Sequence, residues 1–207
     1  MMIAIIKYGM GNVASVQKSL KKLGYSSVIT DNHEEIRQAD FIILPGVGSF
    51  DVGMRNLFNL GLVDLLTQEV VVKKKPFLGI CLGMQLLATY GNEPCKGAGL
   101  GWIDGEVVKI ASEKKLRIPH LGWNNVQTTD SHSDFYQEFA DLDYYFIHSY
   151  HFVAENRKEV VLKVTYDIPM VAALQKENIY AMQFHPEKSQ DAGMRLLKKI
   201  IDQYAQM

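Results

Sequence analysis

The chain has 207 residues, a formal net charge of −1 and a hydrophobic fraction of 47%. These values exclude a strongly basic nucleic-acid-binding protein, and no apolar run is long enough to cross a membrane. Two cysteines provide no disulfide framework, so we expect a reducing, cytoplasmic location, and we expect residues 1–207 to form a single domain.

The first half of the sequence alternates between strand and helix patterns. Short apolar runs predict strands, and apolar residues that recur every three or four positions predict helices. In chain order we expect strand 3–6, helix 13–23, strand 28–29, helix 34–39 capped by Asp31 or Asn32, strand 41–44, helix 62–75, strand 77–80 and helix 82–89. This alternation predicts an α/β fold with a mostly parallel central sheet and helices on both faces.

The second half is richer in β-structure. Between residues 97 and 184 the pattern changes to short apolar segments. The expected strands are 107–108, 144–147, 160–164, 171–174 and 179–184. Apolar residues at helical spacing return at Met194, Leu197, Ile201 and Tyr204, which predicts a C-terminal helix.

One cysteine stands at the junction between a predicted strand and a predicted helix. It lies within Gly79-Ile80-Cys81-Leu82-Gly83, where the glycines leave space for a sharp turn that presents the side chain. A nucleophilic serine occupies such a turn in the Gly-x-Ser-x-Gly elbow, and here sulfur replaces the oxygen. Free N–H groups after the turn would stabilise a thiolate, and the Leu82 N–H would face an oxyanion beside the sulfur. The alternative is a small apolar residue buried at a strand end.

A histidine and a glutamate follow the last predicted strand. Residues two apart in an extended segment face the same side, so His185 and Glu187 can lie together, with Pro186 stiffening the link. Glu187 can then accept a hydrogen bond from one imidazole nitrogen and leave the other to face a thiol. The alternatives are an ordinary surface turn and a metal site of Cys81, His185 and Glu187. Since no close pair of Cys or His has ligand spacing, we expect no metal, and we expect no cofactor.

Both motifs resemble those of the class I, triad-type glutamine amidotransferases. Their sequences are Gly-Ile-Cys-Leu-Gly-Met-Gln and Gln-Phe-His-Pro-Glu-Lys-Ser, in the order and separation typical of that family. Four further segments, at 7–12, 44–50, 119–124 and 146–150, are similar to the glutaminase subunits of imidazole glycerol phosphate synthases. The resemblance covers essentially the whole chain and implies a flavodoxin-like fold, a glutamine substrate and a role in histidine biosynthesis.

The resemblance implies a catalytic triad of Cys81, His185 and Glu187. In such a triad Cys81 attacks the side-chain amide of glutamine, His185 transfers protons, and a γ-glutamyl thioester on the cysteine is then hydrolysed. Glu187 holds the imidazole in the useful tautomer.

The resemblance also implies an oxyanion site and a glutamine site. Residues 45–48, Pro-Gly-Val-Gly, look like the family's oxyanion strand, whose glycines could let a peptide rotate its N–H inward; the residues alone also fit an ordinary glycine-rich turn. From the residues alone, Gln85 could equally be an exposed helix residue and Tyr150 a core aromatic. The implied oxyanion residues are Val47, Gly48 and Leu82, and the implied glutamine-binding residues are Gly46, Gly48, Gln85, Ser149 and Tyr150.

A partner protein is expected because ammonia becomes ammonium in bulk water and then no longer acts as a nucleophile. In the resembled family the partner is a cyclase subunit, a (β/α)₈ barrel that forms a heterodimer with the glutaminase and makes imidazole glycerol phosphate. Asn12, Trp123 and Lys188 lie in motifs that face this partner in the family. Their structural alternatives are a helix cap, a core aromatic and a solvated charge, respectively.

Several positions depart from the common pattern of the family. Lys7 replaces an acidic residue, Asp51 replaces a glycine, and His151 replaces an aromatic residue. These changes spare the triad but raise a rival pathway, in which a similar glutaminase supplies ammonia for sugar amidination in surface-polysaccharide biosynthesis. Hypotheses from other classes are a cysteine peptidase on a related fold and a non-catalytic regulatory binding subunit. Gln85 with the 45–48 loop disfavours the first of these, and the intact triad disfavours the second.

Overall fold

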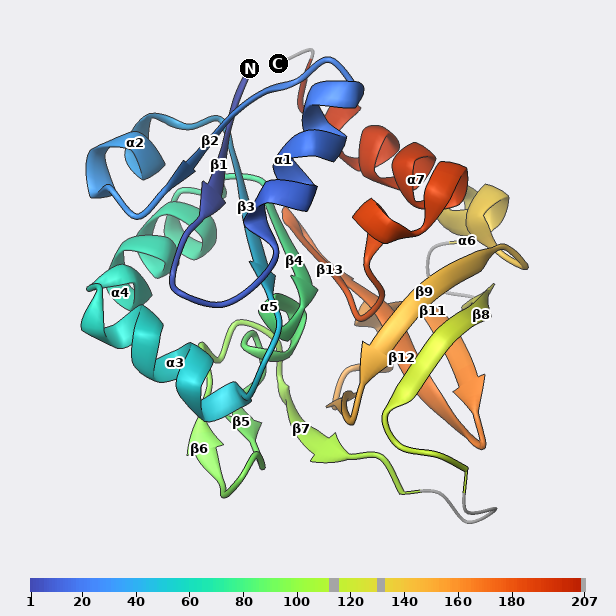
Figure 1. The fold of residues 1–207 in the computed structure, drawn as a ribbon. Helices are drawn as coiled ribbons and strands as arrows, with labels where there is room; N and C mark the ends of the chain where they lie inside the picture. The colour runs from blue at the N-terminus through green and yellow to red at the C-terminus, as the bar shows by residue number, and fades with distance from the viewer. Residues whose placement is uncertain (112–115, 130–132, 206–207) are drawn as a thin grey trace.

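The computed structural model describes residues 1–111, 116–129 and 133–205. Among them, nine strands form one sheet in the order β2-β1-β3-β4-β13-β12-β11-β8-β9 (Figure 1). The first five run parallel to one another, as the alternating sequence pattern predicts. They are β2 (Ser26–Thr30), β1 (Met2–Ile6), β3 (Phe41–Gly46), β4 (Phe77–Cys81) and β13 (Ile179–Met182).

The β-rich second half extends the same sheet with antiparallel strands. Each of these strands pairs antiparallel with its neighbour, starting from β13. The sheet is therefore mixed, with β13 as the strand that joins its parallel and antiparallel halves. The added strands are β12 (Ile168–Lys176), β11 (Val160–Tyr166), β8 (His120–Thr128) and β9 (Asp143–His148).

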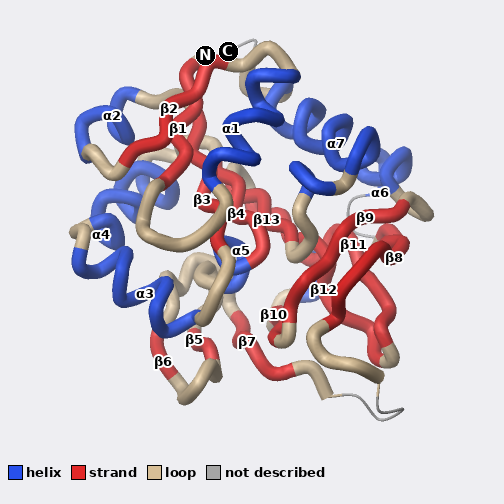
Figure 2. The backbone as a smooth tube through the Cα atoms, in the orientation of Figure 1, coloured by secondary structure: helices blue, strands red, loops and turns tan. Residues whose placement is uncertain are grey.

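Helices cover both faces of the parallel half, as expected (Figure 2). Successive side chains of β1 point to opposite faces, so Ile5 packs with α1 and α7, whereas Ile6 packs in the core beneath α2, α3 and α4. The helices are α1 (Val13–Lys22), α2 (His33–Gln38), α3 (Phe50–Asn59), α4 (Leu62–Leu66), α5 (Leu82–Gln85), α6 (Ser133–Tyr136) and α7 (Gln190–Asp202). A π-helical turn (Thr67–Val72) continues α4, and 3₁₀ turns occupy Gln137–Phe139, Arg157–Glu159 and Pro186–Lys188.

A second, smaller sheet lies beside the parallel half. It has the order β10-β7-β5-β6 and is formed by β10 (Tyr150–Ala154), β7 (Gly105–Lys109), β5 (Tyr90–Gly91) and β6 (Gly97–Ala98). β10 begins two residues after the end of β9, at Tyr150, which is one of the residues that the family resemblance implies for glutamine binding.

One helix begins as the local pattern predicts, whereas tertiary contacts end another helix early. Asn32, one of the two expected caps, accepts hydrogen bonds from the backbone N–H groups of Glu34 and Glu35 at the start of α2. The helix expected over 82–89 ends at Gln85. The carbonyl groups of residues 86–88 instead accept hydrogen bonds from the amides of residues 100–103, so the helix cannot continue.

Candidate active site

The end of β4 presents Cys81 on a sharp turn, as its sequence context predicts. Cys81 has φ of 54° and ψ of −107°, a backbone conformation that residues other than glycine rarely adopt. The turn brings the backbone of Gly83 against Leu44, where a Cβ atom at position 83 would lie 1.8 Å from the Leu44 carbonyl oxygen. The close approach explains why glycine is required two residues after the cysteine.

His185 and Glu187 form a buried hydrogen-bonded pair. His185 Nδ1 donates to Glu187 Oε1 at 2.8 Å, and both side chains are 2% exposed. The backbone around them is held by hydrogen bonds from His185 N to Tyr145 O and from Ser189 Oγ to His185 O. His185 Nε2 is buried with no partner within hydrogen-bonding distance in the described part of the chain. The pair therefore has the predicted arrangement, with Nδ1 oriented by the carboxylate and Nε2 left for the reaction.

The electrostatics of this pair favour a protonated imidazole. Burial lowers the pKa of His185, but the nearby Cys81 sulfur and the hydrogen-bonded Glu187 carboxylate raise it by more, to about 9. The imidazole is therefore positively charged at neutral pH. A positive charge beside Cys81 stabilises the thiolate, which is the nucleophilic form of the residue.

A pocket of about 380 Å³ opens beside Cys81. It brings together seven of the predicted site residues: Cys81, Val47, Gly48, Leu82, Gln85, Ser149 and Tyr150. Gly46 does not line it but lies buried beneath the Tyr8 hydroxyl, which a Cβ atom at position 46 would approach to 2.2 Å. His185 and Glu187 also lie outside the lining, behind the cysteine.

The pocket also contains residues that sequence reasoning missed. Glu93 lines it, and its Oε2 atom accepts a hydrogen bond from the Phe50 amide at the start of α3. This glutamate lies in an irregular loop without periodic pattern, so no local signal marks it. His148 and Pro119 line the pocket within two of the segments on which the family resemblance rests, and that membership was the available signal.

Gln85 is neither exposed nor free, which rules out the alternative of an exposed helix residue. It is 4% exposed, and its Nε2 atom donates to Tyr150 O and to Gln183 Oε1, each at 2.9 Å. The Gln183 amide in turn donates to Cys81 Sγ at 3.7 Å. The structure therefore connects Gln85 to the Cys81 sulfur through Gln183.

The three predicted interface residues lie at the surface. Asn12 is exposed, and its side chain makes no capping hydrogen bond to the described residues of α1. Trp123 is 48% exposed, and it contacts the ring of Tyr145 edge-on, with the ring centres 5.9 Å apart. Lys188 is half-buried, with its ammonium group 5.8 Å from the centre of the same ring. Trp123 is thus no core aromatic, and it shares a surface cluster with Lys188.

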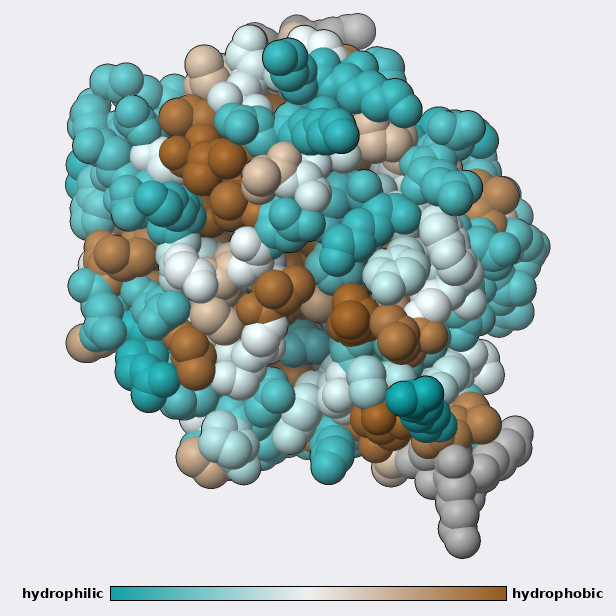
Figure 3. Space-filling model, viewed as in Figure 1, coloured by the Kyte–Doolittle hydropathy of each residue, from teal (hydrophilic) through white to brown (hydrophobic). Residues whose placement is uncertain are grey.

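Apolar side chains are exposed around this cluster and at the pocket mouth. The exposed members are Val47, Leu121, Trp123 and Ile147, which we call the apolar face. Leu121 and Ile147 are direct neighbours across β8 and β9, and Ile147 and Val47 also line the pocket. Hydrophobic residues group at the surface near these strands in Figure 3. A group of exposed apolar side chains beside a pocket is typical of a docking surface.

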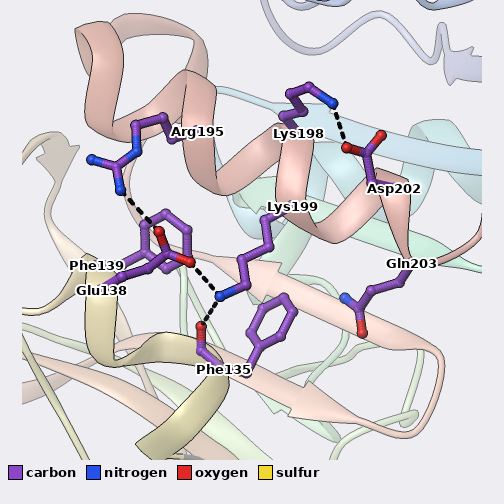
Figure 4. Close-up of a pocket in the computed structure, with 8 residues that line it drawn as sticks. All are labelled: Phe135, Glu138, Phe139, Arg195, Lys198, Lys199, Asp202 and Gln203. Atoms are coloured by element: carbon purple, nitrogen blue, oxygen red, sulfur yellow. Dashed lines mark hydrogen bonds and ion pairs between the residues drawn. The ribbon is translucent and has the colours of Figure 1, made fainter.

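A larger hollow of about 600 Å³ lies between α7 and the segment that contains α6 (Figure 4). Its cations are already paired: Arg195 and Lys199 with Glu138, and Lys198 with Asp202. It contains none of the triad residues. We therefore place the candidate active site at the Cys81 pocket.

Across residues 1–111, 116–129 and 133–205, no helix combines the length and apolarity needed to span a membrane. Within the same ranges, no group of three or more His, Cys, Asp or Glu side chains is arranged to hold a metal ion.

Solved structures of similar fold include glutamine amidotransferases. One protein described as a glutamine amidotransferase superposes with a TM-score of 0.73 at 18% identity, covering 95% of this chain and 98% of that one. A glutamine amidotransferase from Thermotoga maritima superposes with a TM-score of 0.68 at 17% identity, covering 100% and 99%. At these identities the likeness shows the fold alone.

Sequence comparisons are more specific. Residues 4–203 match the family model described as glutamine amidotransferase class-I. The chain is 45% identical over 202 residues to the imidazole glycerol phosphate synthase subunit HisH 2 of Methanococcus maripaludis, covering 98% of this chain and all of the relative. It is 41% identical to the protein of the same name from Pseudomonas aeruginosa, covering 97% and 99%. The chain therefore belongs to the class-I glutamine amidotransferases and, within them, to the family of the imidazole glycerol phosphate synthase HisH subunits.

Proposed function

We propose that this chain, acting as one glutaminase domain over residues 1–207, hydrolyses glutamine through Cys81, His185 and Glu187. It passes the ammonia to a cyclase subunit that forms imidazole glycerol phosphate in histidine biosynthesis. The observation that carries this proposal is the buried His185, whose Nδ1 atom lies 2.8 Å from Glu187 Oε1 and whose pKa is raised by the nearby Cys81 sulfur, which lines a pocket of about 380 Å³. Family membership supports the same reaction class.

The geometry supports a thioester mechanism. The Cys81 thiolate attacks the side-chain amide carbon of glutamine, and the C–N bond then breaks as protonated His185 gives its proton to the departing ammonia. The neutral imidazole next removes a proton from water, which attacks the γ-glutamyl thioester. Glutamate leaves, the thiolate is restored, and His185 is protonated again. Glu187 keeps Nδ1–H fixed throughout, so that Nε2 exchanges every proton.

Backbone amides at the pocket suit the oxyanion that forms on the substrate. The Leu82 N–H follows directly after Cys81, and Val47 and Gly48 line the other side of the pocket. Gly48 has φ of 119°, a value that glycine alone adopts readily, and the Met10 side chain packs against it. Donors aimed at the oxyanion are worth about a hundredfold or more in rate, so rotation of this strand would switch the enzyme on or off.

Polar groups in the pocket suit the two charged ends of glutamine. Glu93 provides a carboxylate for the substrate ammonium group, and Ser149 and Tyr150 provide further hydrogen-bonding groups in the same pocket. Because the Gln85 Nε2 atom is already donating to two carbonyl oxygens, its own side-chain oxygen is the atom it offers to the substrate. We propose Gly46 as a support of the oxyanion strand rather than a direct contact, since it is buried below the pocket.

The partner surface follows from the same region. The apolar face reaches the pocket at Val47 and Ile147, and we propose that this face, with Asn12 and Lys188, contacts the partner so that ammonia leaves without meeting bulk water. A cyclase barrel docked there would form the expected heterodimer. Such a biosynthetic complex is consistent with a cytoplasmic location.

A second candidate pathway is favoured by a feature of the relatives. Several carry a copy number, such as HisH 2 of Pseudomonas aeruginosa and HisH 1 of Campylobacter jejuni, which indicates genomes with more than one such protein. A second copy is free to serve another acceptor, such as a sugar that becomes amidinated. The departures from the family pattern at Lys7, Asp51 and His151 also raise this second pathway.

The test measures glutamate release by the chain alone, with the histidine-pathway cyclase, and with that cyclase plus its acceptor substrate. We expect slow hydrolysis by the chain alone and acceleration by orders of magnitude in the full mixture, since the partner's ligand must favour the active oxyanion geometry. Cys81→Ala should abolish glutamate release but leave the complex active with added ammonium salt. Acceleration by a nucleotide-sugar acceptor alone would transfer the protein to the second pathway, and equal rates in all mixtures would contradict the coupling.

A further inference from the structure

Gln183 lies beside the nucleophile in the centre of the sheet. β13 and β4 pair in parallel up to Met182 and Ile80, so Gln183 is placed one step further along, next to Cys81. Its side chain is fully buried, and its Nε2 atom is 3.7 Å from Cys81 Sγ. Gln183 and His185 are two residues apart and approach the same sulfur, one with an amide and the other with an imidazole.

The orientation of the Gln183 amide is fixed by its neighbours. Gln85 Nε2 donates to Tyr150 O and to Gln183 Oε1, both at 2.9 Å. Two carbonyl-type acceptors identify this Gln85 atom as the nitrogen, because an amide oxygen could not donate to them. Since the Gln183 oxygen accepts from Gln85, its N–H group is the one that faces the sulfur.

The surroundings of Cys81 distinguish between its two protonation states. A neutral thiol can donate to the Ile147 carbonyl oxygen, which lies 3.9 Å from Sγ. A thiolate cannot donate, but it accepts the N–H of Gln183 at full strength, because hydrogen bonds to charged groups are stronger than neutral ones. Cys81 is 6% exposed, so little water competes with this donor.

We infer that Gln183 is a further catalytic residue, which donates a hydrogen bond to the Cys81 thiolate, and that Gln85 is the positioning residue that orients it. This inference rests on the proposed function for its biological meaning. In the resting enzyme the donor holds the reactive form of the sulfur and aims it at the pocket. In the second half of the reaction the same donor stabilises the thiolate as it leaves the thioester.

The test follows the alkylation of Cys81 by iodoacetamide from pH 5 to pH 10, by mass spectrometry, in a Cys95→Ser background because Cys95 is free and exposed. Gln183→Met keeps the approximate shape but removes the N–H, so the midpoint of the alkylation profile should rise by about one pH unit. Gln85→Met should give a smaller rise in the same direction. The matched control is Gln175→Met on β12, whose amide contacts Tyr180 and Tyr136 rather than Cys81, and its profile should match that of the parent.

A purely structural role predicts a different result. If Gln183 only fills space, Gln183→Met will lower thermal stability without moving the alkylation midpoint, and that result would overturn the inference. Should the Met variant fail to fold, Gln85→Met provides the decision, because it leaves Gln183 in place and removes only the donor that orients its amide. An unchanged alkylation midpoint in that variant would count equally against the role. Alkylation needs no glutamine turnover, so this outcome is separate from that of the proposed function.

Discussion

His120 Nδ1 and His148 Nε2 lie 3.0 Å apart in a buried pair that joins β8 to β9. His148 Nδ1 contacts the carbonyl oxygen of Tyr150 at 2.9 Å, so Nδ1 carries the hydrogen and Nε2 must accept from His120. His120 Nε2 then accepts from the Asn124 amide at 3.2 Å. These contacts are satisfied together only when both rings are neutral. The pair therefore holds Tyr150, a wall of the pocket, by a hydrogen-bond chain with one defined direction.

The first prediction concerns acid stability. Burial lowers the pKa of His120 to about 4 and that of His148 to about 3. The unfolded chain takes up protons on these groups near pH 6.5 but the folded chain does not, so their contribution is present above pH 6.5 and is lost as pH falls toward 4. Urea unfolding from pH 7 to 4.5 should show this loss. The His120→Gln, His148→Gln double variant should show a flatter dependence, and an equal slope in both proteins would refute the assignment of neutral rings.

The second prediction concerns the alkaline limit of activity. His185 has a pKa raised to about 9 by Cys81 and Glu187 against the effect of burial, so it is charged at neutral pH and loses its proton as pH rises through 9. Glutamate release should fall in that range, because the neutral ring cannot protonate ammonia. The raised pKa also stabilises the folded protein, and this contribution is fully present below pH 6.5 and is lost as the pH rises through about 9.

Glu187→Gln tests the cause of that limit. Removing the carboxylate removes one of the groups that raise the His185 pKa, so the alkaline limb should move to lower pH and the maximal rate should fall. The same change in an exposed ion pair, Glu138→Gln, should leave both unchanged. A pH profile that is the same in all three proteins would remove Glu187 from the triad.

The third prediction concerns the turn at the nucleophile. A Cβ atom at Gly83 would lie 1.8 Å from the Leu44 carbonyl oxygen, whereas a Cβ atom at Gly97 would meet nothing within 4 Å. Gly83→Ala should therefore destabilise the protein by about 3 kcal/mol or more, or displace the turn and abolish activity. Gly97→Ala is the control and should leave the melting temperature nearly unchanged. Comparable melting curves and activities for both variants would disprove the close packing.

The fourth prediction concerns the apolar face. Trp123→Ala should weaken binding of the cyclase subunit by at least about tenfold, because exposed aromatic residues at the centre of an interface provide much of its affinity. The chain's slow glutaminase activity in isolation should persist. Phe58 is 74% exposed on α3 and serves as the matched control, since Phe58→Ala removes a similar apolar surface elsewhere. Titration calorimetry measures the affinity of each variant for the cyclase subunit. Equal affinities of the Trp123→Ala and Phe58→Ala variants would show that the interface does not include this part of β8.

The parallel half of the sheet can be predicted from sequence because each strand there is a compact apolar run. The sequence pattern misses α3, since its interior Gly53 has no side chain at the place where Leu82 and Leu86 pack; a Cβ atom added there would lie 3.2–3.3 Å from these leucines. It also misses β8, because the pattern of that strand is inverted. His120 is buried on β8 whereas Leu121 and Trp123 are exposed, so hydrophobicity points to the wrong face.

The same distinction holds for the candidate site. Cys81, His185 and Glu187 lie in short motifs whose local geometry is readable, and the structure brings them together. Glu93 enters the pocket from an irregular loop, and Gln183 contacts the sulfur only because β13 pairs with β4. Contacts of that kind depend on strand order, which local patterns do not specify.

The place of β13 between β4 and β12 has a consequence for synthesis of the protein. β4 is made before all of the antiparallel strands, and its neighbour on this side follows every one of them in the chain. Until β13 is made, the two halves of the sheet have no shared strand, and the cysteine has no base beside it. A nascent chain that lacks β13 therefore cannot consume glutamine, and the activity can begin only after this strand is inserted between β4 and β12.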